Sequence, residues 1–181
     1  MAVAREAFAD PARPLQTLPL VGLQPAAEVD RFTQPERNLL LYDGISTTRV
    51  NAAGQVALER VITTYDRAPS GAADTAYLSV ETLFVLDFLR YDVRETFARK
   101  FPRYKLANDG TRAGPGTNIV TPRSARAELI SIARNWETSG RVEDVDGFKD
   151  EIQVERDATD PDRLNMFIPP NLVNGLRVVA A

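Results

Sequence analysis

The longest stretch of helical apolar periodicity in the chain runs from Ser79 to Phe101. Ser79 can cap the first turn, Glu81 suits the positive end of the helix dipole, and Pro102 lacks the amide proton needed to continue. The apolar residues fall in two adjacent stripes, the first comprising Leu83, Leu86, Leu89, Val93, Phe97 and Phe101 and the second Val80, Phe84, Phe88 and Tyr91. The pattern predicts a core helix over 79–101, around which an α+β domain is built.

The composition of the 181 residues, with no cysteine and no histidine, removes most common catalytic chemistry. Disulfides, thiolate or imidazole metal sites, histidine-dependent triads and cysteine nucleophiles are all excluded. Carboxylate, lysine and hydroxyl chemistry remain, but no motif singles out a pair of acids. The glycines at 110–116 do not match a phosphate-binding loop, and the aspartates at 157–162 do not match a calcium loop. We therefore expect no enzyme activity, no catalytic residue, no cofactor and no metal.

The overall charge and hydropathy give no reason to expect a nucleic acid or a membrane as partner. The net charge is −3, from 22 basic and 25 acidic residues. No stretch approaches the ~18 apolar residues of a membrane-spanning helix, and the N-terminus has no signal-peptide core.

The first 30 residues combine four prolines with four leucines, Leu15, Leu18, Leu20 and Leu23. Dense proline disfavours a long helix and favours extended backbone, whereas these leucines are too apolar for a freely solvated linker. We predict an extended arm over residues 1–30 and a core domain over 31–181. The arm lies either on its own core or on a neighbouring subunit.

The remaining pattern predicts two hairpins and two more helices. Thr33 to Glu36 has the form of a capping box, so a helix is expected over 34–43, with Gly44 as its left-handed stop. Thr121–Pro122 opens a second helix that ends near Gly140. Its predicted core face is Ala125, Leu129, Ile132, Ala133 and Trp136. The expected strands are 45–50, 55–65, 152–155, 164–168 and 172–179.

These elements predict an α+β fold. An antiparallel or mixed sheet, made from both hairpins and the last strand, packs on the helices at 79–101 and 122–138.

Charge is polarised along the chain. Residues 90–105 hold six basic and two acidic residues, a net +4, and residues 137–162 hold three basic and ten acidic residues, a net −7. Opposite patches of this kind suit head-to-tail packing of subunits.

Five stretches, read together and in order, resemble one known family. They are DPARPLQTLPLVGL (Asp10–Leu23), ERNLLLYDGI (Glu36–Ile45), FLRYD (Phe88–Asp92), KFPRYKLANDGTR (Lys100–Arg112) and PPNLVNGLRV (Pro169–Val178). The chain is similar to the C-terminal part of the contractile tail sheath protein of Mu-like phages and prophages. That protein is longer at both ends, so the resemblance implies an excised fragment or a truncated prophage product.

The resemblance implies a structural subunit that polymerises around a tail tube and contracts to drive the tube through a host envelope. Its partners would be other copies of the sheath protein and the tail tube protein. It would be assembled in the host cytoplasm and located in the tail of the virion. Extended terminal arms of the family join the sheets of neighbouring subunits, which is strand addition between chains. The expected interface residues are Leu15, Leu18, Leu20 and Leu23 in the arm, Arg94, Arg99 and Arg103 in the basic stretch, and Leu172, Val173, Leu176 and Val178 at the end.

Three alternatives stay open at this point. The first is the sheath of a secretion system or of a phage-derived particle. The second is a carboxylate-based hydrolase of the tail or baseplate, which needs two acids converging in a cleft. The third is nucleic-acid binding through residues 90–105, which the later acidic stretch disfavours.

Overall fold

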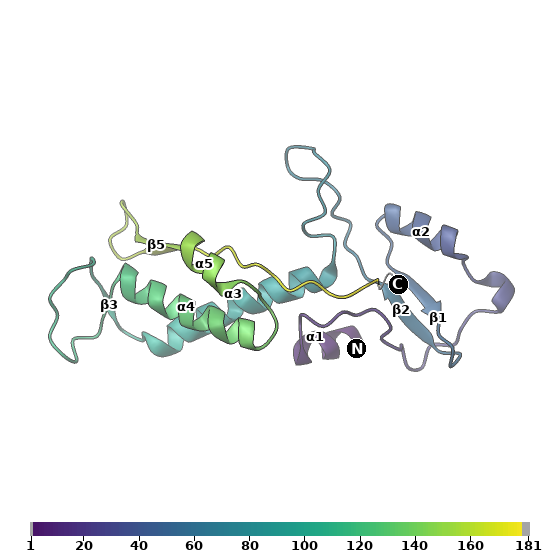
Figure 1. Ribbon diagram of the computed structural model, residues 1–181, viewed down its shortest axis with the longest axis horizontal. Helices are drawn as coiled ribbons and strands as arrows, with labels where there is room; N and C mark the ends of the chain where they lie inside the picture. Colours follow the sequence, from purple (N-terminus) through teal and green to yellow (C-terminus); the bar gives the residue numbers. More distant parts are fainter. Residues whose placement is uncertain (1, 179–181) are drawn as a thin grey trace. The chain divides into compact units, whose positions relative to one another are not determined.

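The computed structural model describes residues 2–178 and divides them into two compact units (Figure 1). Unit 1 contains residues 2–87 and 174–178, and unit 2 contains residues 88–173. The helix α3, Val80–Lys100, crosses from one unit into the other between Asp87 and Phe88. It has the predicted limits to within one residue at each end.

Unit 1 is built on an antiparallel hairpin of β1, Thr47–Val50, and β2, Val56–Arg60. The hairpin turn is held by the Asn51 side chain, whose Oδ1 accepts the backbone N–H groups of Ala53 and Gln55 at 3.0 and 2.9 Å. The other edge of β2 is occupied by the N-terminal arm. Leu20 donates its N–H to the carbonyl of Val56 at 2.8 Å, and Leu58 donates to the carbonyl of Leu18 at 2.9 Å. Unit 1 therefore has a core that includes part of the arm: Leu15, Ala57, Leu58, Ile62 and Val85 are buried.

Three short helices complete unit 1: α1, Ala2–Ala9, the 3-10 helix η1, Glu28–Asp30, and α2, Gln34–Tyr42. The predicted capping box between Thr33 and Glu36 is present at the start of α2, and Gly44 adopts the left-handed stop with φ +75°. A bidentate ion pair links α2 to β2. Arg37 Nε and Nη2 donate to the two carboxylate oxygens of Glu59 at 2.7 and 3.1 Å. The hydrogen bonds from Arg37 lower the pKa of Glu59.

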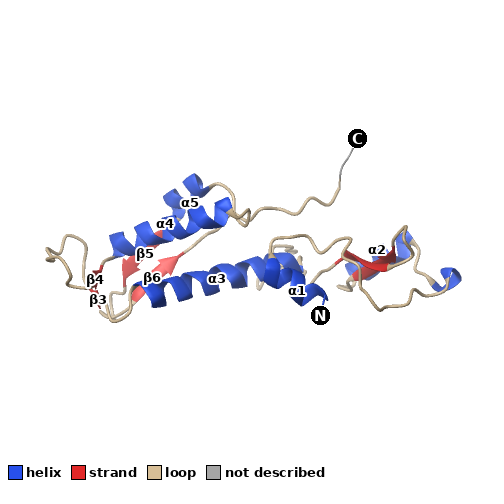
Figure 2. Ribbon diagram, turned by 90° about the horizontal axis from the view of Figure 1, so that it is seen from below, coloured by secondary structure: helices blue, strands red, loops and turns tan. Residues whose placement is uncertain are grey.

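Unit 2 places α4, Pro122–Thr138, alongside the second part of α3, with the hairpin of β5, Gln153–Arg156, and β6, Leu164–Phe167, next to α4 (Figure 2). The short helix α5, Val145–Glu151, also packs on α4. The strands β3, Lys105–Leu106, and β4, Ile119–Val120, form a small parallel pair. The face of α4 predicted to be core is buried in full: Ala125, Leu129, Ile132, Ala133 and Trp136.

The α+β class is confirmed, but the single predicted sheet is not found in the described residues. Three separate two-stranded sheets take its place. One cause is local to unit 1, where the arm occupies the free edge of β2 that a further strand would need. The last predicted strand is also wrong within 172–178, where only Leu172 forms an isolated bridge, to Val142. Val179, the end of that predicted strand, lies outside the described residues.

Several elements were not predicted from the sequence. Residues 2–9 are helical and not extended, because the proline-free AVAREAFA precedes Pro11. The helix α5 and the parallel pair β3–β4 lie in stretches expected to be irregular or unassigned. The predicted division into an arm over residues 1–30 and a core domain over 31–181 stays a prediction.

Candidate functional site

The arginines predicted as interface residues are exposed on unit 2. Arg94 and Arg99 lie on α3, and Arg103 follows it in a turn with φ +61°. No carboxylate in the described part of the chain forms an ion pair with any of the three. Lys100, from the same basic stretch, pairs with Glu128 of α4. The three arginines are therefore available to a partner, whereas Lys100 is used inside the unit.

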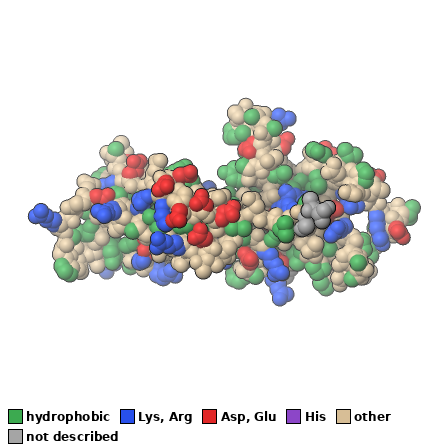
Figure 3. All heavy atoms as spheres, viewed as in Figure 1, with side chains coloured by type: hydrophobic (Ala, Val, Ile, Leu, Met, Phe, Trp, Pro, Cys, Tyr) green, Lys and Arg blue, Asp and Glu red, His purple; other side chains and the backbone are tan. Residues whose placement is uncertain are grey.

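The acidic stretch of unit 2 forms a surface over the α4–α5 region, where red side chains gather in Figure 3. Asp144 begins α5 with φ +57°, and its Oδ1 accepts the Gly147 N–H at 3.0 Å. Asp146 pairs with Lys149, which lowers the pKa of its carboxyl. The exposed members of this acidic surface are Glu143, Asp144, Asp146, Asp150, Glu151 and Glu155.

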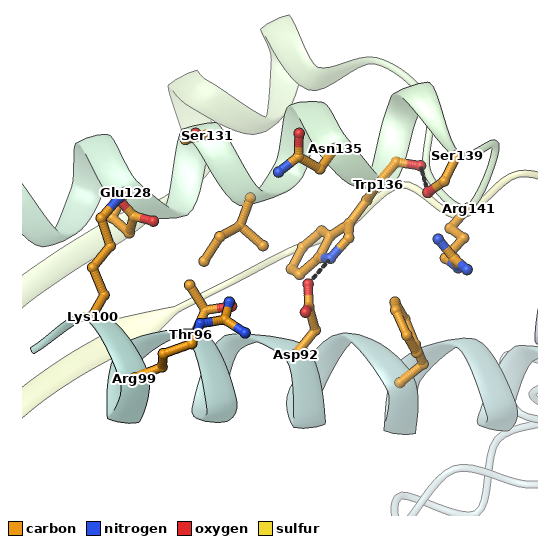
Figure 4. Close-up of a pocket in the computed structure, with 12 residues that line it drawn as sticks. Asp92, Thr96, Arg99, Lys100, Glu128, Ser131, Asn135, Trp136, Ser139 and Arg141 are labelled. Carbon is orange, nitrogen blue, oxygen red and sulfur yellow. Dashed lines mark hydrogen bonds and ion pairs between the residues drawn. The ribbon is translucent and has the colours of Figure 1, made fainter.

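A groove of about 660 Å³ lies between α3 and α4 (Figure 4). Its two acids have separate structural partners. Asp92 Oδ2 accepts the indole N–H of Trp136 at 2.7 Å, and Glu128 binds Lys100. At one end of the groove the Arg141 guanidinium stacks on the Phe88 ring, 4.3 Å from its centroid. Because the two carboxylates face different partners, the groove does not present the converging pair that a carboxylate-based hydrolase needs.

The described residues present neither a metal cluster nor a membrane-spanning helix. Within 2–178, no group of three or more acidic side chains is placed to hold a metal ion. No helix in this part of the chain combines the length and apolar character needed to cross a membrane.

The four predicted arm residues have different environments within unit 1. Leu15 is only 2% exposed and is a core residue of its own chain. Leu18 and Leu20 are half-buried where the arm pairs with β2, and Leu23 is 57% exposed beyond that pairing. Residues 15–20 of the arm therefore lie on the core of their own chain, which is the first of the two alternatives predicted for the arm.

The predicted residues near the C-terminus are divided between the two units. Leu172 and Val173 belong to unit 2, where Val173 donates its N–H to the carbonyl of Arg141 at 3.2 Å. Leu176 and Val178 belong to unit 1 and are 76% and 80% exposed. The structure thus does not bring the two parts of this predicted set into one unit.

An exposed apolar surface in unit 1 was not predicted from the sequence. The helix α2 buries none of its residues, although three leucines and a tyrosine stand in succession at 39–42. The sequence signal for this surface was the run of four apolar residues itself. Four consecutive residues cannot all lie on one stripe of a helix, so some of them must face away from the core. The large apolar side chains exposed here and along the arm are Phe8, Val21, Leu23, Val29, Phe32, Leu39, Tyr42 and Ile45.

Comparison with known proteins gives a family match, one sequence relative and one solved structure of similar fold. Residues 72–181 match the family model described as the phage tail sheath C-terminal domain. The chain is 48% identical over 178 residues to the Mu-like prophage FluMu tail sheath protein of Haemophilus influenzae, covering 98% of this chain and 36% of that protein. The chain thus spans little more than a third of that curated relative. The fold is similar to that of the sheath tail protein from Desulfitobacterium hafniense, with a TM-score of 0.65 and 13% identity over 92% of this chain and 35% of that one.

Proposed function

The chain belongs to the phage tail sheath C-terminal domain family, and from this membership we propose that it is part of a structural subunit of a contractile tail sheath. Its partners are other copies of the sheath protein and the tail tube, and its location is the tail of the virion. The observation that carries the proposal is the contiguous family match together with large apolar side chains exposed along the arm and terminal segment, as at Leu23, Leu176 and Val178. Exposed apolar surface of this kind marks protein contacts.

The proposed contacts of unit 1 are made by its exposed arm and terminal residues. Leu23, Leu176 and Val178 supply apolar area to a neighbouring subunit, and the backbone of 174–178 forms no ladder hydrogen bonds in the described chain. An extended segment with free backbone groups adds readily to a sheet edge. Leu18 and Leu20, where the arm pairs with β2, border the Leu23 contact, and Leu15 serves the core of its own chain. Leu172 and Val173 are proposed interface residues of unit 2.

The proposed contacts of unit 2 are electrostatic. Arg94, Arg99 and Arg103 of one copy face the acidic surface of another, which fixes the register of head-to-tail packing. Exposed ion pairs contribute only about 0–1 kcal/mol each and are screened beyond roughly 10 Å at 0.1 M salt. Association through this surface should therefore weaken as salt rises.

Sedimentation velocity across a salt series tests the electrostatic contact. We expect reversal of Arg94, Arg99 and Arg103 to glutamate to abolish the salt-sensitive part of self-association. The matched control reverses Arg5, Arg31 and Arg67, three exposed arginines of unit 1, and should leave it unchanged. The proposal would be contradicted by oligomers whose amount depends neither on the salt concentration nor on the reversal of Arg94, Arg99 and Arg103.

The proposal includes no catalytic activity. Its support is that Asp92 and Glu128, the acids of the α3–α4 groove, are each held by a structural partner. Peptidoglycan cleavage that disappears on substituting one aspartate or glutamate would overturn this part of the proposal.

A further inference from the structure

One buried carboxylate in unit 1 is contacted by both terminal segments. Glu81, in the first turn of α3, is 6% exposed. Its Oε1 accepts the backbone N–H of Leu15 in the arm at 3.1 Å, and its Oε2 accepts from Nη2 of Arg177 in the terminal segment at 3.4 Å. A buried carboxylate without a cation is costly, so Glu81 needs a positive partner at this place.

A second arginine lies beside the same site. Arg60, at the end of β2, donates from Nη2 to the hydroxyl of Ser79 at 3.0 Å, and Arg177 donates from its own Nη2 to that same oxygen at 3.3 Å. The Nη1 atoms of both arginines are buried, and neither has a hydrogen-bond partner in the described part of the chain. Burial first, and then the charge of Arg177, lower the pKa of Arg60. Two guanidinium groups therefore share the neighbourhood of one carboxylate.

The terminal segment has few other attachments to unit 1. Gly175 lies against the arm so closely that a Cβ there would come within 2.8 Å of Pro14 Cγ. Leu176 and Val178 point their apolar side chains to the surface. Arg177 is thus the polar anchor of residues 174–178, and its hydrogen bonds to Ser79 and Glu81 are both long.

We propose that Arg60 can replace Arg177 as the ion-pair partner of Glu81. Residues 174–178 can then detach from unit 1 while the Glu81 carboxylate stays paired. When Arg177 departs, the Arg60 side chain, which already binds the adjacent Ser79, turns to Glu81. This exchange keeps the carboxylate paired and removes the repulsion between two half-buried guanidinium groups. The arm stays attached, because Glu81 still accepts the Leu15 N–H.

The site around Glu81 therefore allows residues 174–178 to detach while the N-terminal arm stays bound. Its use in assembly rests on the proposed function, in which the released segment engages a neighbouring subunit. The exchange of arginines at Glu81 is a property of the isolated chain. A failure of the sheath proposal and a failure of the exchange are therefore distinguishable.

A mutant cycle on the full chain tests the exchange by thermal unfolding. We expect Arg177→Ala and Arg60→Ala each to lower the Tm by less than about 3 °C, because the remaining arginine serves Glu81. The double variant leaves a buried carboxylate unpaired and should lower the Tm by at least about 8 °C, which exceeds the sum of the two. In a Glu81→Gln background, where no charge needs a partner, this excess should disappear. That background also keeps the test decisive if the double variant does not fold.

Hydrogen exchange gives the second measurement. In Arg177→Ala the amides of residues 174–178 should exchange faster while the Leu15 amide stays protected, and only the double variant should expose Leu15. The proposal fails if Arg177→Ala alone matches the double variant in Tm or releases the Leu15 amide. It also fails if the excess penalty persists in the Glu81→Gln background. Sedimentation of the same variants reports separately on assembly.

Discussion

The indole N–H of Trp136 donates to the Asp92 carboxylate at 2.7 Å and so joins α4 to α3 within unit 2. Trp136 is 2% exposed, and its ring is packed with the other apolar residues on the buried face of α4. One side chain thus provides apolar area to the core and a polar link between its two main helices (Figure 4).

Trp136→Phe should destabilise unit 2 by about 1–3 kcal/mol, because it leaves the half-buried Asp92 carboxylate without its donor. Urea unfolding followed by circular dichroism measures this loss. Asp92→Asn is the matched control, since the amide keeps an acceptor oxygen for the indole and should cost less. Equal losses in both variants would mean that the hydrogen bond is not the source of the effect.

Leu15→Ala should lower the free energy of unfolding by about 2–5 kcal/mol, the usual result of truncating a buried leucine. Leu23→Ala, in the exposed part of the same arm, should change it by less than about 0.5 kcal/mol. Thermal or urea unfolding of the two variants compares these losses. A Leu15→Ala variant as stable as the parent chain would contradict the core position of Leu15.

Tyr65 should titrate late in the folded chain. Its hydroxyl donates to Asp74, and that hydrogen bond raises the pKa of Tyr65 to about 12, while the same bond lowers the pKa of Asp74. A raised folded pKa means that the stabilising contribution is fully present below the unfolded pKa of about 10 and is lost as the pH rises towards 12. Phenolate absorbance measures the titration, and Asp74→Ala, which removes the acceptor, should return one tyrosine to its ordinary range. No difference between the two titrations would contradict the contact.

The turn between β5 and β6 should resist acid. Asp157 accepts the Asn165 side-chain amide at 2.9 Å, and its other oxygen accepts the N–H groups of Thr159 and Asp160 at 2.8 and 2.9 Å. These bonds, the one from Asn165 first, lower the pKa of Asp157. Its contribution is therefore present above the unfolded pKa of about 3.9 and is lost only as the pH falls below that value.

Carbon-detected NMR of the carboxyl groups measures this effect. The Asp157 carboxyl should remain ionised at a pH of about 3, and Asp157→Ala, which removes both acceptor oxygens, should disorder the turn at every pH. Asp162→Asn, at the other side of the same turn, should leave the titration of Asp157 unchanged. An Asp157 signal that titrates in the ordinary range would refute the prediction.

The sequence by itself determined the main helices and the family. The limits of α3 and α4, the capping box at Thr33 and the buried face around Trp136 all follow from spacing and end signals that act over a few residues. The resemblance to the tail sheath family was carried by motifs in order, and the family match confirmed it. Predictions of this kind succeed because a helix is specified by contacts three and four residues apart.

Only the tertiary structure decided which distant segments meet. The sequence predicted one sheet, but the edge of β2 is taken by the arm, and this pairing depends on residues about 40 positions apart that no periodicity relates. The sequence placed Glu81 at the positive end of the helix dipole, but its contacts with the arm and the terminal segment appear only in the packed unit. Burial and charge pairing are set by the whole packed unit, because a side chain's solvent access depends on every segment around it.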